Sequence, residues 1–270
     1  MQKVLWTPSE EVKYGCRMAD FMRFVNRNLG TAFHEYKELY QWSVTDIPSF
    51  WDQLWHYFDV IASKPYDAVV NDLGRFPGAK WFVGAKLNYA ENILRYCDND
   101  GDAITFRGEN FLRRTLSRRE LKAQAEALAT AFRSEGIRPG DAVAGYMPNL
   151  PETIIAMLAA AAVGAIWCSC ATDIGAVAAT DRVGQVKPKI LVTADGYRYK
   201  GKTFSTHDNV RELAKNIPSL KRVIVVHYAG EEAFDDIPNA VRYEDYLKPA
   251  PADFAFVSVH LIALLEYMTH

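Results

Sequence analysis

The sequence is poor in cysteine, in net charge and in leader-like apolar segments, and each shortage excludes a class of protein. Only four cysteines occur among 270 residues, which is too few for a disulfide framework. The first residues, MQKVLWTPSEEVKYG, contain no apolar run of the kind that forms a signal peptide. Lys and Arg number 31 against 33 Asp and Glu, so no excess of positive charge favours nucleic acid or a membrane surface. We expect a cytoplasmic protein with neither partner, and its oligomeric state stays open.

Several motifs of enzymes and metal sites are also missing. The sequence has no G-x-S-x-G, H-E-x-x-H or G-x-G-x-x-G segment. Cys168 and Cys170 lie two apart in an apolar run and would share one face of a strand, but no histidine or second cysteine pair stands at zinc-ligand spacing. We expect these two thiols to be buried and inert, and we predict no metal ligand and no catalytic residue.

One uncharged stretch, Thr153–Thr172, is long enough to span a bilayer. Pro151 and Glu152 before it are typical of a helix start, and Gly164 inside it is typical of a helix end. The rest, residues 165–170, has the composition of a buried strand. We therefore predict a helix followed by a strand, and no membrane span.

The first hundred residues are rich in aromatic side chains and in helical patterns. Residues 87–96 predict a helix with Leu87, Ile93 and Leu94 on or near its buried face. The segment 46–58 predicts another helix, with Pro48 in its first turn. One face of that helix carries an apolar stripe, for which core packing is a commoner use than partner binding: Phe50, Trp51, Leu54, Trp55 and Phe58.

From residue 102 onward, short apolar runs alternate with helical segments. This alternation predicts an α/β fold with a doubly wound parallel sheet, preceded by the helical, aromatic-rich N-terminal region. Ser117 and Glu120 have the spacing of a capping box at the start of one helix, which should stop at Gly136. The expected strands are 103–108, 142–147, 165–170, 189–194 and 222–227, and the helices between them are 118–135, 151–163, 175–186 and 208–217.

Gly196–Thr203 satisfies the pattern G-x-x-x-x-G-K-[ST] of a phosphate-cradling P-loop. Taken literally, Lys202 would contact a γ-phosphate and Thr203 a magnesium ion, as in a nucleotide hydrolase. The segment FSTHD, however, separates this loop from the next predicted helix, and the strand 222–227 ends in His227 rather than aspartate. A second interpretation rests on Arg198, Lys200 and Lys202 interleaved with two tyrosines, which suits an adenine ring and a phosphate. A solvated basic turn explains the same residues equally well.

Four long segments resemble the acetoacetyl-CoA synthetase group of AMP-forming acyl-CoA synthetases, the adenylate-forming superfamily. The resemblance runs from about residue 30 to residue 257, and the segments are YKELYQWSVTDIPSFW (36–51), WFVGAKLNYAENIL (81–94), GYMPNLPETIIAMLAAAAVGAIWCSCATDIG (145–175) and VKPKILVTADGYRYKGK (186–202). It implies a ligase that joins acetoacetate to CoA through an acyl-adenylate, with ATP, CoA and Mg²⁺ as small-molecule partners. It also implies that Arg198, Tyr199 and Lys202, with Lys200 as an alternate, hold the CoA nucleotide.

The sequence departs from the family in two places. CSCATDIG (168–175) stands where relatives read S-S-x-S-P-D-F-G, and no segment of the form SSGTTGKPK follows residue 257. The resemblance therefore implies an incomplete adenylate-forming N-domain: a helical region 1–100, a truncated α/β part of the AMP-binding domain 101–257, and an unmatched apolar tail 258–270. Its run 254–265 could form a last strand or helix, or be foreign sequence. Such a chain is expected to be inactive alone, and a non-catalytic CoA- or nucleotide-binding module is the alternative.

Overall fold

The computed structural model describes residues 5–230 and 234–260. The chain divides into two compact units. The first unit takes residues 1–60 and 66–84, and the second takes residues 61–65 and 85–270.

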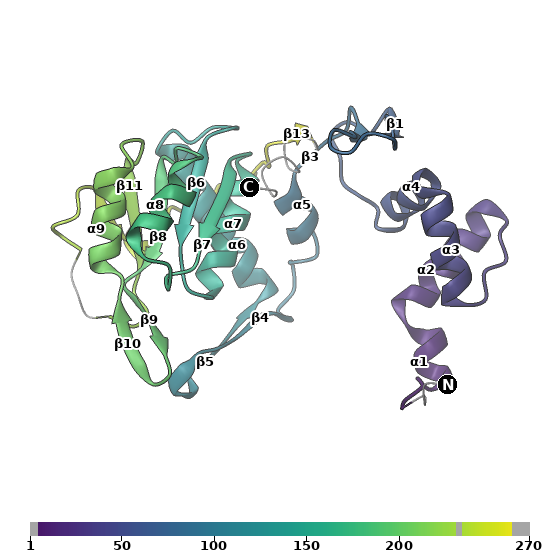
Figure 1. The fold of residues 1–270 in the computed structure, drawn as a ribbon, viewed down its shortest axis with the longest axis horizontal. Coiled ribbons are helices and arrows are strands. Elements are labelled where there is room, and N and C mark those ends of the chain that lie inside the picture. The colour runs from purple at the N-terminus through teal and green to yellow at the C-terminus, as the bar shows by residue number, and fades with distance from the viewer. Residues whose placement is uncertain (1–4, 231–233, 261–270) are drawn as a thin grey trace. The chain divides into compact units, whose positions relative to one another are not determined.

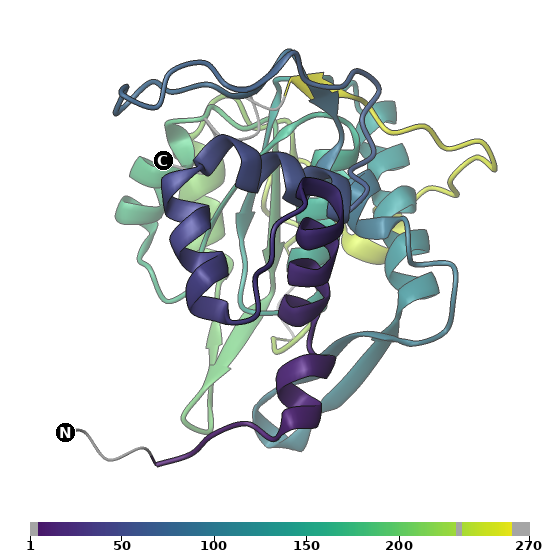
Figure 2. The ribbon, with the colours of Figure 1, turned by 90° about the vertical axis from the view of Figure 1, so that its right-hand side faces the viewer.

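The first unit is mainly helical, and Figure 2 shows its helices in purple and dark blue. A small apolar core joins α2, α3 and α4, with Phe21 and Val25 buried among side chains that include Phe50 and Tyr57. The rings of Phe21 and Tyr57 meet edge to face at 5.1 Å. The elements of this unit are α1 (Glu10–Gly15), α2 (Arg17–Leu29), α3 (Tyr36–Thr45), α4 (Ile47–Tyr57), β1 (Ala68–Val70) and β2 (Trp81–Val83).

The aromatic stripe on α4 is buried only in part. Asp46 caps this helix by accepting the amide of Ser49, and Pro48 lies in the first turn as predicted. Three stripe residues are half-buried, whereas Trp51 and Phe58 are exposed. Core packing therefore accounts for part of the stripe and not for all of it.

The second unit is an α/β layer structure (Figure 1). Its elements are β3 (Lys86–Leu87), α5 (Tyr89–Leu94), β4 (Asp102–Arg107), a 3₁₀ turn (Glu109–Phe111), β5 (Arg113–Ser117), α6 (Arg118–Ser134), β6 (Ala142–Tyr146), α7 (Pro151–Ala162), β7 (Ile166–Cys170), α8 (Ala176–Gly184), β8 (Ile190–Ala194), β9 (Gly196–Tyr199), β10 (Lys202–Ser205), α9 (His207–Asn216), β11 (Arg222–Val226), β12 (Ala240–Arg242), α10 (Tyr243–Tyr246) and β13 (Val259–His260).

A five-stranded parallel sheet forms the middle layer, in the order β12-β11-β8-β6-β7. One face packs against α5, α6, α7 and α10, and the other packs against α8 and α9. Neighbouring strand residues are buried on opposite faces, as Val143 and Ala144 are on β6. This arrangement confirms the predicted doubly wound α/β fold. The strand order reverses between β6 and β8, and sheets of this kind place ligands outside the carboxyl ends of the strands at such a point.

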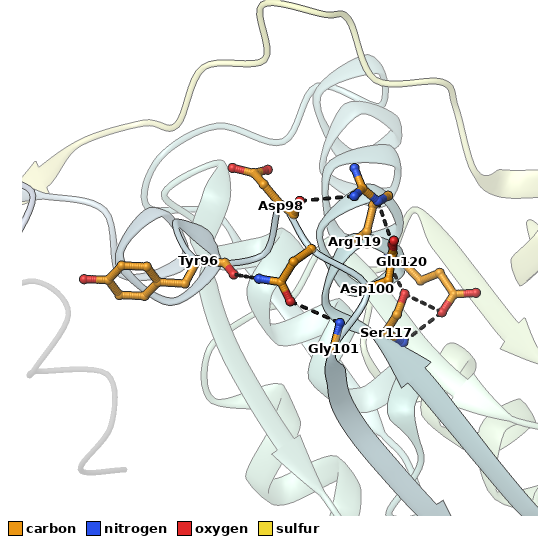
Figure 3. Close-up of polar contacts among 8 residues, drawn as sticks. Tyr96, Asp98, Asp100, Gly101, Ser117, Arg119 and Glu120 are labelled. Atoms are coloured by element: carbon orange, nitrogen blue, oxygen red, sulfur yellow. Dashed lines mark hydrogen bonds and ion pairs between the residues drawn. The ribbon is translucent and has the colours of Figure 1, made fainter. Parts of the chain in front are cut away.

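The capping box at the start of α6 is confirmed (Figure 3). The Ser117 hydroxyl accepts the amide of Glu120 at 3.2 Å, and the Glu120 carboxylate accepts the amide of Ser117 at 2.8 Å. Arg119, the second residue of α6, donates to the Asp100 carboxylate at 2.8 Å and to the Asp98 carbonyl at 3.1 Å. These contacts fix the end of β5 against the loop that precedes β4.

The segment that could have spanned a membrane forms α7 and then β7, as predicted. None of the helices in the described ranges combines the length and hydropathy that crossing a bilayer requires. The helix expected over 87–96 is shorter, because α5 begins only at Tyr89. Leu94 is buried on α5, and Leu87 is buried within β3. Ile93 is exposed, so the expected burial of Ile93 was wrong. At the C-terminal end, β13 pairs with β3, and the rest of the apolar tail, 261–270, lies outside the described residues.

Candidate functional site

The segment predicted to contact a ligand forms a β-hairpin at the carboxyl end of β8. Strands β9 and β10 pair antiparallel, with Tyr199 opposite Lys202 and Arg198 opposite Thr203. The rings of Tyr197 and Phe204, which also face each other, stack at 5.1 Å. We call residues 196–205 the basic hairpin.

The pairing divides the predicted ligand residues between two faces. Directly opposed residues of an antiparallel pair share a face, so Tyr199 and Lys202 lie together. The Lys200 ammonium lies over the Tyr199 ring, 5.1 Å from its centroid, so Lys200 lies with these two residues. Arg198 lies on the other face, where its guanidinium donates to the Thr203 hydroxyl at 3.1 Å. The structure therefore brings three of the four predicted residues together and separates the fourth.

A carboxylate from a distant part of the chain holds the turn of the basic hairpin. Lys200 and Gly201 have positive φ angles of 51° and 74°, which a two-residue hairpin turn requires. Their amides both donate to Glu109, each at 2.9 Å. Figure 1 shows the tips of the β9–β10 and β4–β5 ribbons meeting where these bonds form. Glu109 thus fixes the turn that carries Lys200, and nothing in the local sequence indicated this contact across 91 positions.

The hairpin geometry also differs from that of a P-loop. A P-loop passes from a strand into a helix whose N-terminus faces the phosphate, whereas Gly196–Thr203 passes from β9 into β10. Helix α9 begins only at His207. The turn amides point at a carboxylate, and Thr203 accepts a hydrogen bond from Arg198. The phosphate cradle that the motif describes is absent from this segment.

Asp195 anchors the base of the basic hairpin, and the sequence reasoning did not single it out. This buried residue joins β8 to β9, and its Oδ1 accepts the amides of Tyr228 at 2.9 Å and Ala229 at 2.8 Å. Its Oδ2 lies 2.6 Å from Nδ1 of His227. A carboxylate directly after a buried strand was the available signal. The contacts tie the carboxyl ends of β8 and β11 together beneath the hairpin.

Tyr228, just after the carboxyl end of β11, contacts β4 at the same edge of the sheet. Burial raises the pKa of the Tyr228 hydroxyl, and the nearby Arg198 charge acts in the opposite direction. The Tyr228 ring meets that of Phe106 on β4 edge to face, with centroids 6.0 Å apart. A Cβ at Gly108 would lie 3.0 Å from the Tyr228 hydroxyl, so a larger residue there would push this side chain aside.

The cysteines differ from expectation in one respect. Cys168 and Cys170 are half-buried rather than buried, because β7 is an edge strand of the sheet. Burial raises the pKa of both thiols, that of Cys170 to about 11, which leaves them protonated at neutral pH. Over residues 5–230 and 234–260, no three His, Cys, Asp or Glu side chains gather into a group that could hold a metal ion.

Two family models match this α/β chain. The model for AMP-binding enzymes covers residues 95–258, which include the parallel sheet and the basic hairpin. The model for the acetyl-coenzyme A synthetase N-terminus covers residues 36–93. The chain therefore belongs to the AMP-binding enzyme family.

Several matching relatives are acetoacetyl-CoA synthetases, which confirms the predicted resemblance. The acetoacetyl-coenzyme A synthetase of Rhizobium meliloti is 40% identical over 86% of this chain and 35% of its own length. That of Xenopus tropicalis is 38% identical over 91% of this chain and 37% of its own length. The solved structure of acetoacetyl-CoA synthetase from Streptomyces lividans has a TM-score of 0.88 and 39% identity, over 96% of this chain and 40% of that chain. The chain spans just over a third of the length of the curated relatives it matches.

Proposed function

We propose that this chain is the part of an acetoacetate–CoA ligase that binds the nucleotide of CoA, through the basic hairpin. The observation that carries this proposal is the cluster of Tyr199, Lys200 and Lys202 on one face of the hairpin. Within residues 5–230 and 234–260, the ammonium groups of both lysines have no acidic partner. Two ammonium groups without an acidic partner on one face of a hairpin are suited to the phosphates of a nucleotide.

The position of the hairpin supports the same ligand. It leaves the carboxyl end of β8, next to the reversal between β6 and β8, where open α/β sheets bind ligands. Asp195 and Glu109 hold its base and its turn, so the cations are placed before a ligand arrives. A site organised in advance loses less conformational entropy on binding. Arg198, on the opposite face, is available to a second phosphate of the same ligand.

In the proposed reaction, an acetoacetate oxygen attacks the α-phosphorus of ATP and pyrophosphate leaves. The thiol sulfur of CoA then attacks the acyl carbon of the adenylate and AMP leaves, with the thiol proton going to solvent. The hairpin acts in the second step by holding the nucleotide end of CoA. Among residues 5–230 and 234–260, no three His, Cys, Asp or Glu side chains gather into a group that could hold a metal ion, so we derive no step through the Mg²⁺ that the family uses.

A calorimetric titration of the 270-residue chain with CoA tests the proposal. CoA should bind, and pantetheine, which lacks the nucleotide, should release no heat. Replacing both Lys200 and Lys202 with Gln should weaken CoA binding about 30-fold, since hydrogen bonds to charged groups contribute about 1.5–3 kcal/mol. Arg75→Gln, an exposed change in the other unit, is the matched control. Equal binding of CoA and pantetheine would overturn the proposal.

Adenylate formation is a separate question and needs a separate assay. The 270 residues contain no segment of the form SSGTTGKPK, so we expect exchange of labelled pyrophosphate into ATP at background level when acetoacetate and Mg²⁺ are supplied. CoA binding with background exchange describes a nucleotide-binding part without adenylating activity. Exchange well above background would contradict this expectation and leave CoA binding untouched.

A further inference from the structure

Next to the basic hairpin is a hollow of about 560 Å³, within the size range of small-molecule sites. It lies at the connection between β4 and β5, and the turn of the hairpin closes one side. We call it the arginine hollow; its lining residues are Arg107, Gly108, Glu109, Phe111, Leu112, Arg113 and Gly201.

Two like charges face each other across this hollow. Arg107, the last residue of β4, is directly opposite Arg113, the first residue of β5. Directly opposed residues have Cβ atoms about 4.5–5.5 Å apart, and like charges in that position are destabilising. In the part of the chain that the structure describes, neither guanidinium has an ion pair, whereas the next residue, Arg114, pairs with Glu152. The pair therefore carries a local repulsion that a bound anion would relieve.

The one acid in the lining is already engaged. Both oxygens of Glu109 accept hairpin amides at 2.9 Å, which directs the carboxylate toward the turn. Two arginines and one glutamate leave the lining with a net charge of +1. Lys200 and Lys202 flank the hollow through Gly201 and add to the positive potential.

An aromatic ring completes the lining. Phe111 is fully exposed and has a φ of 59°, a backbone conformation that is costly for a bulky residue. Strained residues of this kind are found at ligand clamps. Its ring and the half-exposed Leu112 supply an apolar surface on which a flat base can stack.

We propose that the arginine hollow binds a phosphorylated nucleoside, with the phosphate between Arg107 and Arg113 and the base on Phe111. Within the proposed function, on which this assignment rests, the ligand is the 3′-phosphoadenosine end of CoA. The hairpin cations then face its diphosphate, so one ligand relieves both unpaired groups of positive charge. The arginines are specificity-determining residues for the 3′-phosphate.

Titration with adenosine 3′,5′-bisphosphate and with inorganic pyrophosphate separates the contributions. Arg113→Gln and Arg107→Gln should each weaken bisphosphate binding about tenfold, since each removes a charge-assisted contact. Phe111→Ala should weaken the bisphosphate several-fold and leave pyrophosphate unchanged. Arg75→Gln is again the matched control. Arg113→Glu gives a readout without ligand: it should raise the melting temperature by removing the repulsion, while abolishing binding of the bisphosphate.

The outcomes distinguish this inference from the proposed function. If the arginine variants bind the bisphosphate like the wild type while the double Lys200→Gln, Lys202→Gln variant loses it, the hollow is not the site and the hairpin function stands. If the unmodified chain binds neither CoA nor the bisphosphate, both proposals are wrong. A lower melting temperature for Arg113→Glu would show that the arginine pair has a structural partner and would also overturn the inference.

Discussion

Charged side chains at the amino ends of the parallel strands have ion-pair partners, whereas two lysines at the carboxyl ends have none among the described residues. At the amino edge, Arg222 at the start of β11 donates to both oxygens of Glu135 at 2.8 and 2.7 Å, and Lys189 pairs with Asp141 at 2.6 Å. At the carboxyl edge, Lys200 and Lys202 have no acidic partner among residues 5–230 and 234–260. The paired charges at the amino edge hold elements together, as Asp195 does at the carboxyl edge, whereas the two hairpin lysines await a ligand that supplies the opposite charge.

Removing Asp195 should have the largest effect, because it is the buried paired carboxylate of the carboxyl edge. Asp195→Ala leaves two amides without an acceptor and should lower the free energy of unfolding by about 3 kcal/mol. Urea unfolding measures this change. Asp208→Ala, which removes an exposed carboxylate on α9, should cost less than about 0.5 kcal/mol. Equal losses for the two variants would show that burial of Asp195 does not matter.

Breaking the amino-edge pair should cost somewhat less. Glu135→Gln should lower the free energy of unfolding by about 2 kcal/mol at neutral pH, because the hydrogen bonds to Arg222 lose their charge. The same hydrogen bonds hold the pKa of Glu135 below its usual 4.5. A lowered pKa contributes stability that is present above the unfolded-state value and is lost as the pH falls through the folded-state value.

The pH dependence gives that prediction a second check. The stability difference between wild type and Glu135→Gln should be constant near neutral pH and should shrink below a pH of about 4.5. Urea unfolding at several pH values measures it. A difference that grows on acidification would contradict the assignment of the pKa shift to the Arg222 pair.

The amount that could be predicted from sequence differs between the fold and the site. The parallel sheet and the α6 capping box follow from local patterns, because apolar runs and cap spacing act over a few residues. Ile93 was misplaced because the short helix α5 turns Ala90 and Leu94 inward instead. The boundaries of the helices and strands do not test the domain boundaries that we expect near residues 100 and 257. Those two boundaries stay a prediction.

The site was predicted in composition but not in shape. The residue types at 198–202 indicated an anionic ligand, but a lysine at positive φ is not a usual hairpin signal. The turn forms with help from Glu109, which is 91 positions away. A contact of that separation leaves no periodic pattern, so neither the hairpin nor the separation of Arg198 from Tyr199 could be read from spacing.

Glu109→Gln tests how firmly the carboxyl edge is organised. The neutral amide keeps one acceptor oxygen, so the exposed turn should lose at most about 1 kcal/mol. Amide hydrogen exchange at Lys200 and Gly201 should become several-fold faster, because their amides are then less protected. Glu212→Gln, a change at a half-buried residue of α9, is the matched control. Unchanged exchange at both amides would mean that the turn is stable without the carboxylate.

The double replacement of the hairpin lysines should have the smallest effect on stability and the largest effect on CoA binding. Replacing both Lys200 and Lys202 with Gln should change the free energy of unfolding by less than about 0.5 kcal/mol, since no acid in the described ranges loses a partner. Arg222→Gln removes one cation at the amino edge and should cost about 2 kcal/mol, because Glu135 keeps its charge without its partner. Urea unfolding of both variants measures the contrast. If the lysine variant were the less stable of the two, the hairpin cations would have structural partners. The absence of an acidic partner would then no longer support a ligand site at the hairpin.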